Sequence, residues 1–234
     1  MVAGFIVTGD SDKRVILRAL GPSLASVGLI GVLADPTLTL YDSTGRLMEA
    51  NDDRLALPGV INPLLPPDPS ESLLTAILPP GNYTAVLEGG NETSGVGLVE
   101  LYDVEPGSSG VANISARADI AAAADLIIGG FIIGGTDPTQ VIVRALGPSL
   151  ATFGVSDPLP DPVLELFDAN GVLVEVNDNW RSTQEKEIMA TIPPTNDLES
   201  AIVATLPPGD YTALVHDATH SAGVGLVEVY NLEP

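Results

Sequence analysis

Hydrophobic and polar residues alternate along several short stretches of this chain. Within Thr37–Tyr41 the leucines fall on one face and the threonines on the other, which is the period of a strand with one buried face. Comparable stretches rich in β-branched residues follow at close spacing, without the longer period of a helix. In the first half of the chain they read VILRAL, TLTLYD, LLTAIL, YTAVLE and VGLVELYDV. The pattern predicts a succession of short strands.

Turn-forming residues separate these stretches. Asp42–Gly45 and Asp168–Gly171 are typical of hairpin turns in which glycine adopts a positive φ, and Pro-Pro-Gly precedes Asn82 and Asp210 in the same way. The chain contains 24 glycines and 20 prolines, which fits frequent turns. Strands and turns in this order predict an all-β fold of the antiparallel sandwich type.

The chain is a near-complete duplication. KRVILRALGPSL in the first half matches TQVIVRALGPSL in the second, DPTLTLYDSTG matches DPVLELFDANG, and GVGLVELYDVEP matches GVGLVEVYNLEP. We therefore predict two tandem antiparallel β-sandwich (jelly-roll-like) domains, at residues 1–106 and 113–234, with a linker at 107–112. A strand predicted at Asn113–Ile120 precedes the second copy and has no counterpart before the first. We therefore expect one of two arrangements. Either the chain is an excerpt from a longer array, or the first sandwich lacks an N-terminal strand and presents an open edge that a neighbouring chain must fill.

The two copies differ in length at one place only. Arg54–Glu71 in the first copy is two residues shorter than Trp180–Glu199 in the second. Since loops absorb insertions, this stretch is predicted to be a surface loop, with a short helix near Thr183–Ala190.

Charge and cysteine content narrow the functions open to the protein. The 234 residues include 31 acidic and 9 basic side chains, a formal net charge of −22, which repels phosphate backbones and anionic lipids. Nucleic acid is not an expected partner. No cysteine is present, which excludes disulfides, thiolate metal sites and cysteine nucleophiles. The apolar stretch Ile120–Gly135 is short and carries Asp125, so membrane insertion is not expected either.

The block RALGPSL is identical at Arg18–Leu24 and Arg144–Leu150. It is close to the G-x-S-x-G turn of serine hydrolases, which needs a histidine near Ser23 or Ser149. The two histidines, His216 and His220, occur only in the second copy, where the first copy has glutamates. We therefore interpret the block as a structural corner and the chain as not an enzyme. In this interpretation the arginines pair with Glu100 or Glu228, and the structural residues are Arg18, Gly21, Pro22, Arg144, Gly147 and Pro148.

Two other groups of residues suggest ligand sites. Clusters of side-chain oxygens suit Ca²⁺, which takes about six to eight oxygen ligands, but the same residues also cap turns. Trp180, the single tryptophan, lies in the variable loop and would either stack on a sugar ring or pack over the end of the sandwich. The calcium candidates are Asn51, Asp52, Asp53, Asn177, Asp178 and Asn179.

LYDSTGRLMEANDD followed by ESLLTAILPPGNYTAVLEG resembles the bacterial pre-peptidase C-terminal (PPC) domain. The resemblance covers about Pro36–Val104 and Pro162–Leu232, and the RALGPSL block lies outside it. The whole unit also resembles repeats of large bacterial surface proteins. The resemblance implies a jelly-roll-like sandwich, export from the cell, often bound Ca²⁺, and an accessory role in adhesion or in binding polysaccharide or protein. Any calcium role would fall on Asn51, Asp52, Asp53 and their partners in the second copy.

Together these observations predict a non-enzymatic, extracellular or cell-surface structural module. We expect it to associate with neighbouring copies of itself, with one sandwich completed by a strand from another chain. The alternative is a carbohydrate-binding or adhesion module attached to a secreted enzyme, with polysaccharide as its partner and Trp180 as its main feature.

Overall fold

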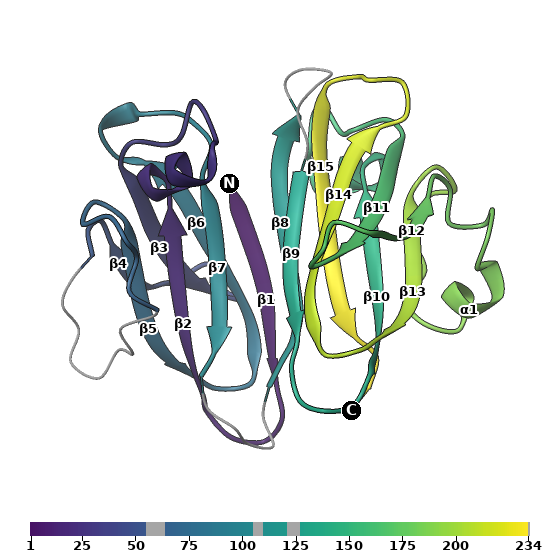
Figure 1. The fold of residues 1–234 in the computed structure, drawn as a ribbon, viewed down its shortest axis with the longest axis horizontal. Helices are drawn as coiled ribbons and strands as arrows, with labels where there is room; N and C mark the ends of the chain where they lie inside the picture. Colours follow the sequence, from purple (N-terminus) through teal and green to yellow (C-terminus); the bar gives the residue numbers. More distant parts are fainter. Residues whose placement is uncertain (55–63, 105–109, 121–126, 234) are drawn as a thin grey trace. The chain divides into compact units, whose positions relative to one another are not determined.

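The computed structural model describes residues 1–54, 64–104, 110–120 and 127–233. Its elements are almost entirely antiparallel strands, which confirms the all-β prediction (Figure 1). The chain divides into two compact units, Met1–Ala112 and Asn113–Pro234. Within the described ranges no helix is long and apolar enough to cross a membrane.

The first unit contains two sheets. One has the order β1-β6-β3-β4, and the other is three-stranded with the order β5-β2-β7. Their inward side chains form one core, in which Leu17 of β2 meets Leu38 of β3 and Ala85 of β6. The strands are β1 (Val2–Thr8), β2 (Lys13–Leu20), β3 (Pro36–Asp42), β4 (Leu47–Asn51), β5 (Ser72–Leu78), β6 (Gly81–Gly89) and β7 (Leu98–Asp103).

The second unit repeats this arrangement with one more strand. One sheet has the order β12-β11-β14-β9, and the strands of the other pair in the order β13-β10-β15-β8. Its core is again formed by both sheets. The strands are β8 (Gly110–Ile120), β9 (Ile127–Ile133), β10 (Thr139–Leu146), β11 (Pro162–Asp168), β12 (Leu173–Asn177), β13 (Ser200–Leu206), β14 (Gly209–Asp217) and β15 (Gly223–Asn231).

Short helical turns lie in several of the connections between strands. A 3-10 turn follows each RALG sequence, at η1 (Pro22–Val27) and η4 (Pro148–Phe153), and another, η3, covers Gly90–Glu92. The helix expected near Thr183–Ala190 is α1 (Glu185–Met189). The variable loop of the first copy falls partly on residues 55–63, which lie outside the described ranges.

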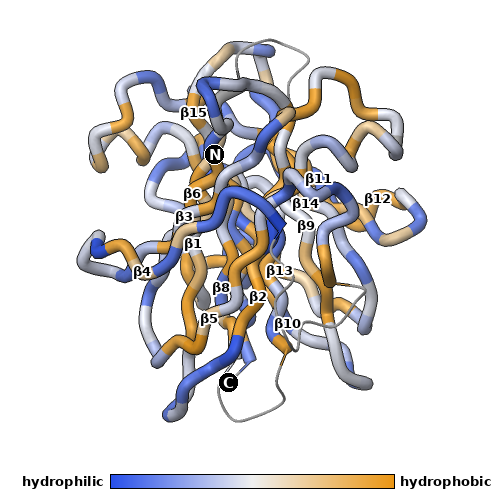
Figure 2. Tube along the Cα trace, turned by 90° about the vertical axis from the view of Figure 1, so that its left-hand side faces the viewer, coloured by the Kyte–Doolittle hydropathy of each residue, from blue (hydrophilic) through white to orange (hydrophobic). Residues whose placement is uncertain are grey.

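The strands follow the alternation seen in the sequence. Along β3 and β6 buried residues alternate with half-exposed or exposed ones, and the tube changes colour along the strands as hydrophobic and hydrophilic residues follow one another (Figure 2). At the predicted linker the strand begins earlier than the sequence indicated, since β8 starts at Gly110 and not at Asn113. Gly110–Ala112 of the predicted linker are therefore strand, since Val111 packs against the first core; residues 107–109 lie outside the described ranges.

Candidate functional site

The RALGPSL block forms the corner where a strand ends and a 3-10 turn begins. A Cβ on Gly21 would lie 2.1 Å from the carbonyl oxygen of Leu33, and one on Gly147 would lie 2.1 Å from that of Leu159. Only glycine fits so close an approach of two backbones. The following proline starts the 3-10 turn in both units, because its fixed φ suits the first position.

A fully buried glutamate holds each corner together. Glu71 Oε1 accepts hydrogen bonds from the backbone N–H groups of Gly21 at 3.0 Å and Ser23 at 2.9 Å, and from the Ser23 hydroxyl at 2.5 Å. Its other oxygen accepts from the N–H of Asp68 at 3.1 Å. The same bonds recur in the second unit, where Glu199 takes the place of Glu71. Each carboxylate thereby satisfies buried donors that the turn leaves without partners.

This arrangement gives the serine hydroxyls a structural role. Ser23 donates to the same carboxylate oxygen that holds the backbone of the corner, and Ser149 does the same with Glu199. Turning either hydroxyl toward a substrate would break that bond. His216 Nδ1 lies 3.2 Å from the carbonyl oxygen of Asp217, and His220 sits in a turn with φ of 61°. Both serine hydroxyls thus belong to the hydrogen bonds that hold the corner.

Arg18 and Arg144 form the ion pairs expected from the sequence. Arg18 Nε donates to Glu100 at 2.6 Å and its Nη2 to the hydroxyl of Tyr102 at 2.8 Å. Its third group, Nη1, donates to the Leu64 carbonyl at 3.2 Å and so fastens the variable loop to the sheet. In the second unit Arg144 binds Glu228 and the carbonyl of Ile192 in the same way.

A tyrosine completes each of these clusters. The Arg18 guanidinium lies 5.0 Å from the ring centre of Tyr102, and that of Arg144 lies 5.1 Å from the ring centre of Tyr230. Burial, and next the neighbouring glutamate, raise the pKa of both tyrosine hydroxyls. Each of the three guanidinium nitrogens donates to an acceptor, so the cluster, called here the arginine clasp, connects the strands to the variable loop.

Two of the calcium candidates hydrogen-bond to the backbone, and the other four are exposed or half-buried. Asn51 Oδ1 accepts from the N–H of Leu73 at 3.1 Å, and Asn177 Oδ1 accepts from the N–H of Ala201 at 3.0 Å. Each asparagine thereby joins a strand of one sheet to a strand of the other. Asp52, Asp53 and Asp178 are exposed, and Asn179 is half-buried. Within the described ranges no three His, Asp or Glu side chains are grouped so that they could hold a metal ion. Calcium binding stays a prediction.

Trp180 takes the second of its two expected roles. It is 1% exposed, it packs with Ile142 and Ile188 in a small core beneath the variable loop, and its Nε1 donates to the Asn196 carbonyl at 3.1 Å. The Arg181 guanidinium lies 3.9 Å from the ring centre. No face of the indole is therefore open for a sugar ring, and the sugar-stacking role fails because the ring is buried.

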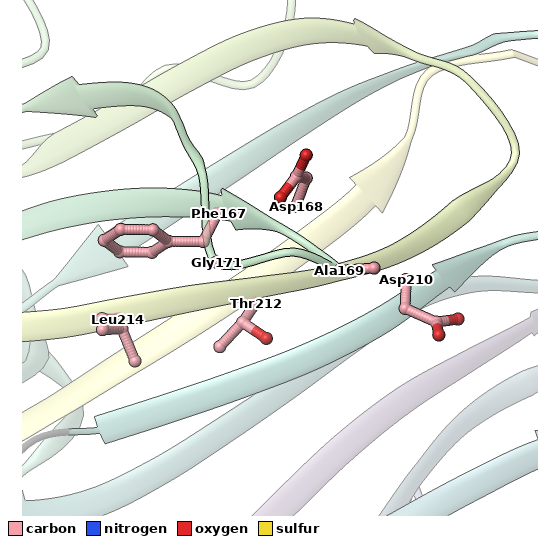
Figure 3. A pocket seen from close by; sticks show the side chains of 7 residues that line it. All are labelled: Phe167, Asp168, Ala169, Gly171, Asp210, Thr212 and Leu214. Carbon is pink, nitrogen blue, oxygen red and sulfur yellow. The ribbon is translucent and has the colours of Figure 1, made fainter.

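A depression lies on the outer face of the second unit, between β11, β14 and the hairpin after β11 (Figure 3). Phe167 and Leu214 form its apolar part, with Thr212 and Asp210 beside them. Its one other carboxylate, Asp168, already accepts from the N–H groups of Asn170 and Val172, both at 2.9 Å. These hydrogen bonds lower the pKa of Asp168, the Val172 bond most. Asp168 thus serves the hairpin turn.

Sequence reasoning did not find Glu71 and Glu199, the central groups of the corners. The available signal was a Glu-Ser pair, which recurs at Glu71-Ser72 and Glu199-Ser200 directly before strands β5 and β13. Both serines are also buried, and their hydroxyls donate to the carbonyls of Pro36 and Pro162 at 2.5 and 2.6 Å.

Comparisons with known proteins leave the family open. No protein-family model matches the chain, and no curated protein does. Among solved structures, a protein from Eubacterium rectale described as secreted aligns with 97% of this chain and 68% of its own, at 12% identity and a TM-score of 0.24. A chain from the atomic structure of Sulfolobus Turreted Icosahedral Virus aligns over 97% of this chain and 88% of its own length, at 9% identity and a TM-score of 0.30. Similarity this low identifies neither the family nor the function, and the PPC resemblance stays a prediction.

Proposed function

We propose that this chain is a non-enzymatic structural module that works outside the cell by associating with copies of itself. The observation that carries the proposal is that the polar residues shared by the two copies form contacts within the fold. The corner serines, the buried glutamates, the arginine clasps and the strand-linking asparagines all bind backbone or one another. A sequence that repeats these residues is maintaining a scaffold.

Self-association is supported by the surface of the second unit. β9 is the last strand of its sheet, and its outward residues Ile128 and Ile132 are 55% and 67% exposed. Val174 and Val176 of β12, at the other end of the same sheet, are also exposed. A sheet end that offers apolar side chains together with unpaired backbone favours contact with another chain. The net charge of −22 on each copy opposes such contacts at low salt and keeps the protein soluble.

An extracellular location is part of the proposal and is supported by the PPC resemblance. The alternative function, carbohydrate binding, rested mainly on Trp180. Since that ring is buried, it does not support the alternative.

Electron micrographs of the purified protein, with and without the substitution Ile132→Lys, test this function. We expect regular assemblies of the unmodified chain and their loss in the variant, because a charge at that position opposes burial. The matched control is Ile77→Lys, which replaces an isoleucine of similar exposure, 58%, on β5. Assemblies that persist unchanged in Ile132→Lys would refute the role of β9. A fluorophosphonate probe that labels Ser23 or Ser149 would refute the non-enzymatic part.

A further inference from the structure

The two units differ at one edge of one sheet. In the second unit β15 pairs with β10 on one side and with Asn113–Ile120 of β8 on the other. In the first unit the equivalent strand is β7. Among the strands that the structure describes, β7 pairs with β2 and is the last strand of the order β5-β2-β7.

The two edges have almost the same sequence, so their chemistry is the same. Gly97–Tyr102 reads GLVELY and Gly225–Tyr230 reads GLVEVY. Both strands also carry the arginine clasp on the same face, through Glu100 and Glu228. An edge that accepts a strand in one unit therefore has the side chains to accept one in the other.

Burial differs between the edges in the direction expected if a strand is missing beside β7. Val227 and Val229 of β15, which pairs with β8, are 2% and 8% exposed, whereas their counterparts Val99 and Leu101 are only half-buried. The side chain of Glu228 is 11% exposed and that of Glu100 is 24% exposed. The edge of a sheet offers backbone N–H and C=O groups for pairing, and a strand that pairs there also covers half-buried apolar side chains.

β8 shows what kind of strand fits this edge. Its residues Ile114, Ala116 and Ala118 alternate along one face and pack against the core of the second unit. In the pairing of β8 with β15, Ala116 lies opposite Val227 and Ile114 lies opposite Val229. The Asn113 side chain adds a hydrogen bond of 3.0 Å to the carbonyl of Val229.

We propose that the edge of β7 is a strand-acceptor site and that its occupant is a strand of the β8 type from a second copy of the repeat. The strand binds antiparallel, in the register of β8 on β15. Residue 116 of the donor then lies opposite Val99, residue 114 opposite Leu101 and residue 117 opposite Leu98. That the donor is another copy rests on the proposed function, whereas the acceptor chemistry of β7 rests on the comparison of the two units.

A synthetic peptide with the sequence of β8, GVANISARADI, tests the acceptor directly. Since the protein has no cysteine, Leu98→Cys introduces a single thiol at the proposed edge, and the peptide carries Arg117→Cys at the position opposite. The matched control is Leu226→Cys, the equivalent position on β15, which Arg117 of the chain's own β8 already faces. We expect a mixed disulfide with the Leu98→Cys protein and none with the Leu226→Cys protein.

Binding of a fluorescent β8 peptide to the unmodified protein gives a second readout that depends on no variant. We expect saturable binding, which a peptide with Ala116→Asp loses because a carboxylate would enter the core. No binding, or equal crosslinking at both positions, would overturn the acceptor site. The outcome is separable from self-association, since peptide binding is measured on the unmodified chain whether or not copies assemble.

Discussion

At the scale of single residues, the corner at Gly21 depends on the carboxylate of Glu71, a role that the sequence around Glu71 does not indicate. Glu71 follows a polar, proline-rich loop and would ordinarily be taken for a surface residue. Its role is visible only in the folded chain, where Glu71 lies beside Gly21 and Ser23 and one of its oxygens accepts three hydrogen bonds. Pro22, by contrast, was predictable because its restriction of φ is local. Gly21 was predicted beside it, although the contact with the Leu33 carbonyl that requires glycine is visible only in the fold.

Replacing Glu199 with glutamine should destabilise the protein by about 2–3 kcal/mol, because the amide removes the charge and turns one acceptor into a donor that faces buried N–H groups. Urea unfolding measures the change. Ser149→Ala is the control and removes only one donor to the carboxylate, so it should lower stability by about 1 kcal/mol. Equal stability of Glu199→Gln and the unmodified protein would show that the carboxylate does not hold the corner.

Asp161 differs from Glu199, because the folded state disfavours the ionised form of its side chain. Its Oδ1 is buried and has no hydrogen-bond partner among the described residues, and burial, then Asp178 and Asp217, raise its pKa. A raised pKa of an acid in the folded state means that its ionised form lowers stability above that pKa. Asp161→Asn should therefore stabilise the protein at pH 7 by about 1 kcal/mol.

The measurement for Asp161 is thermal unfolding at several pH values. The stabilisation should shrink as pH falls and Asp161 itself becomes protonated. Asp35, the equivalent residue of the first unit, accepts a hydrogen bond from Asn91 at 3.3 Å, so Asp35→Asn should give no such gain. Destabilisation by Asp161→Asn at pH 7 would contradict this explanation.

At the scale of elements, the sequence predicted the strands well where one face is buried, and it predicted the ends of the strands less well. Thr37–Tyr41 alternates clearly and lies inside β3, and the short helix expected in the variable loop is α1. The start of β8 was placed three residues late, because the segment before Asn113 is rich in glycine and serine and Val111 gains its packing partners only in the fold. The strand-linking role of Asn51 was also missed, since its partner Leu73 is distant in sequence.

The variable loop of the second unit is predicted to be held by its own small core. Trp180→Ala should lower stability by about 3–5 kcal/mol, because it removes the largest side chain between Ile142 and Ile188. Tryptophan fluorescence of the unmodified protein should be blue-shifted and should not respond to oligosaccharides. A fluorescence change that saturates with a sugar would contradict the packing role.

The hairpin turns should make stability depend on pH. Hydrogen bonds from the side chains of Thr44 and then Arg46 lower the pKa of Asp42, and the N–H of Val172 lowers that of Asp168. A lowered pKa in the folded state gives stability that is complete above the unfolded value, about 4, and is lost as pH falls through the folded value. The urea midpoint should therefore decrease below about pH 4.

The double variant Asp42→Asn, Asp168→Asn separates these turns from the other acids. Asparagine can keep the turn hydrogen bonds and does not titrate, so the decrease at low pH should be smaller in the variant. An identical decrease in both proteins would assign the effect to other carboxylates.

At the scale of the whole molecule, the duplication could be recognised in the sequence, whereas the function of the protein could not. Repeated strands and turns define the fold because each depends on neighbours within a short stretch. The proposed self-association depends on exposed side chains, and the exposed isoleucines of β9 occur in a stretch whose sequence predicts only a strand. The edge of β7 was the exception, since comparing the two copies in the sequence had already drawn attention to an edge of the first unit.

Sedimentation velocity of the unmodified protein over a wide range of concentration tests the central claim most directly, because a self-associating module must grow by mass action. We expect the sedimentation coefficient to rise with concentration, and to rise further when added salt screens the charge of −22. A single species with the mass of one chain, 24.1 kDa, at every concentration and salt level would contradict the account.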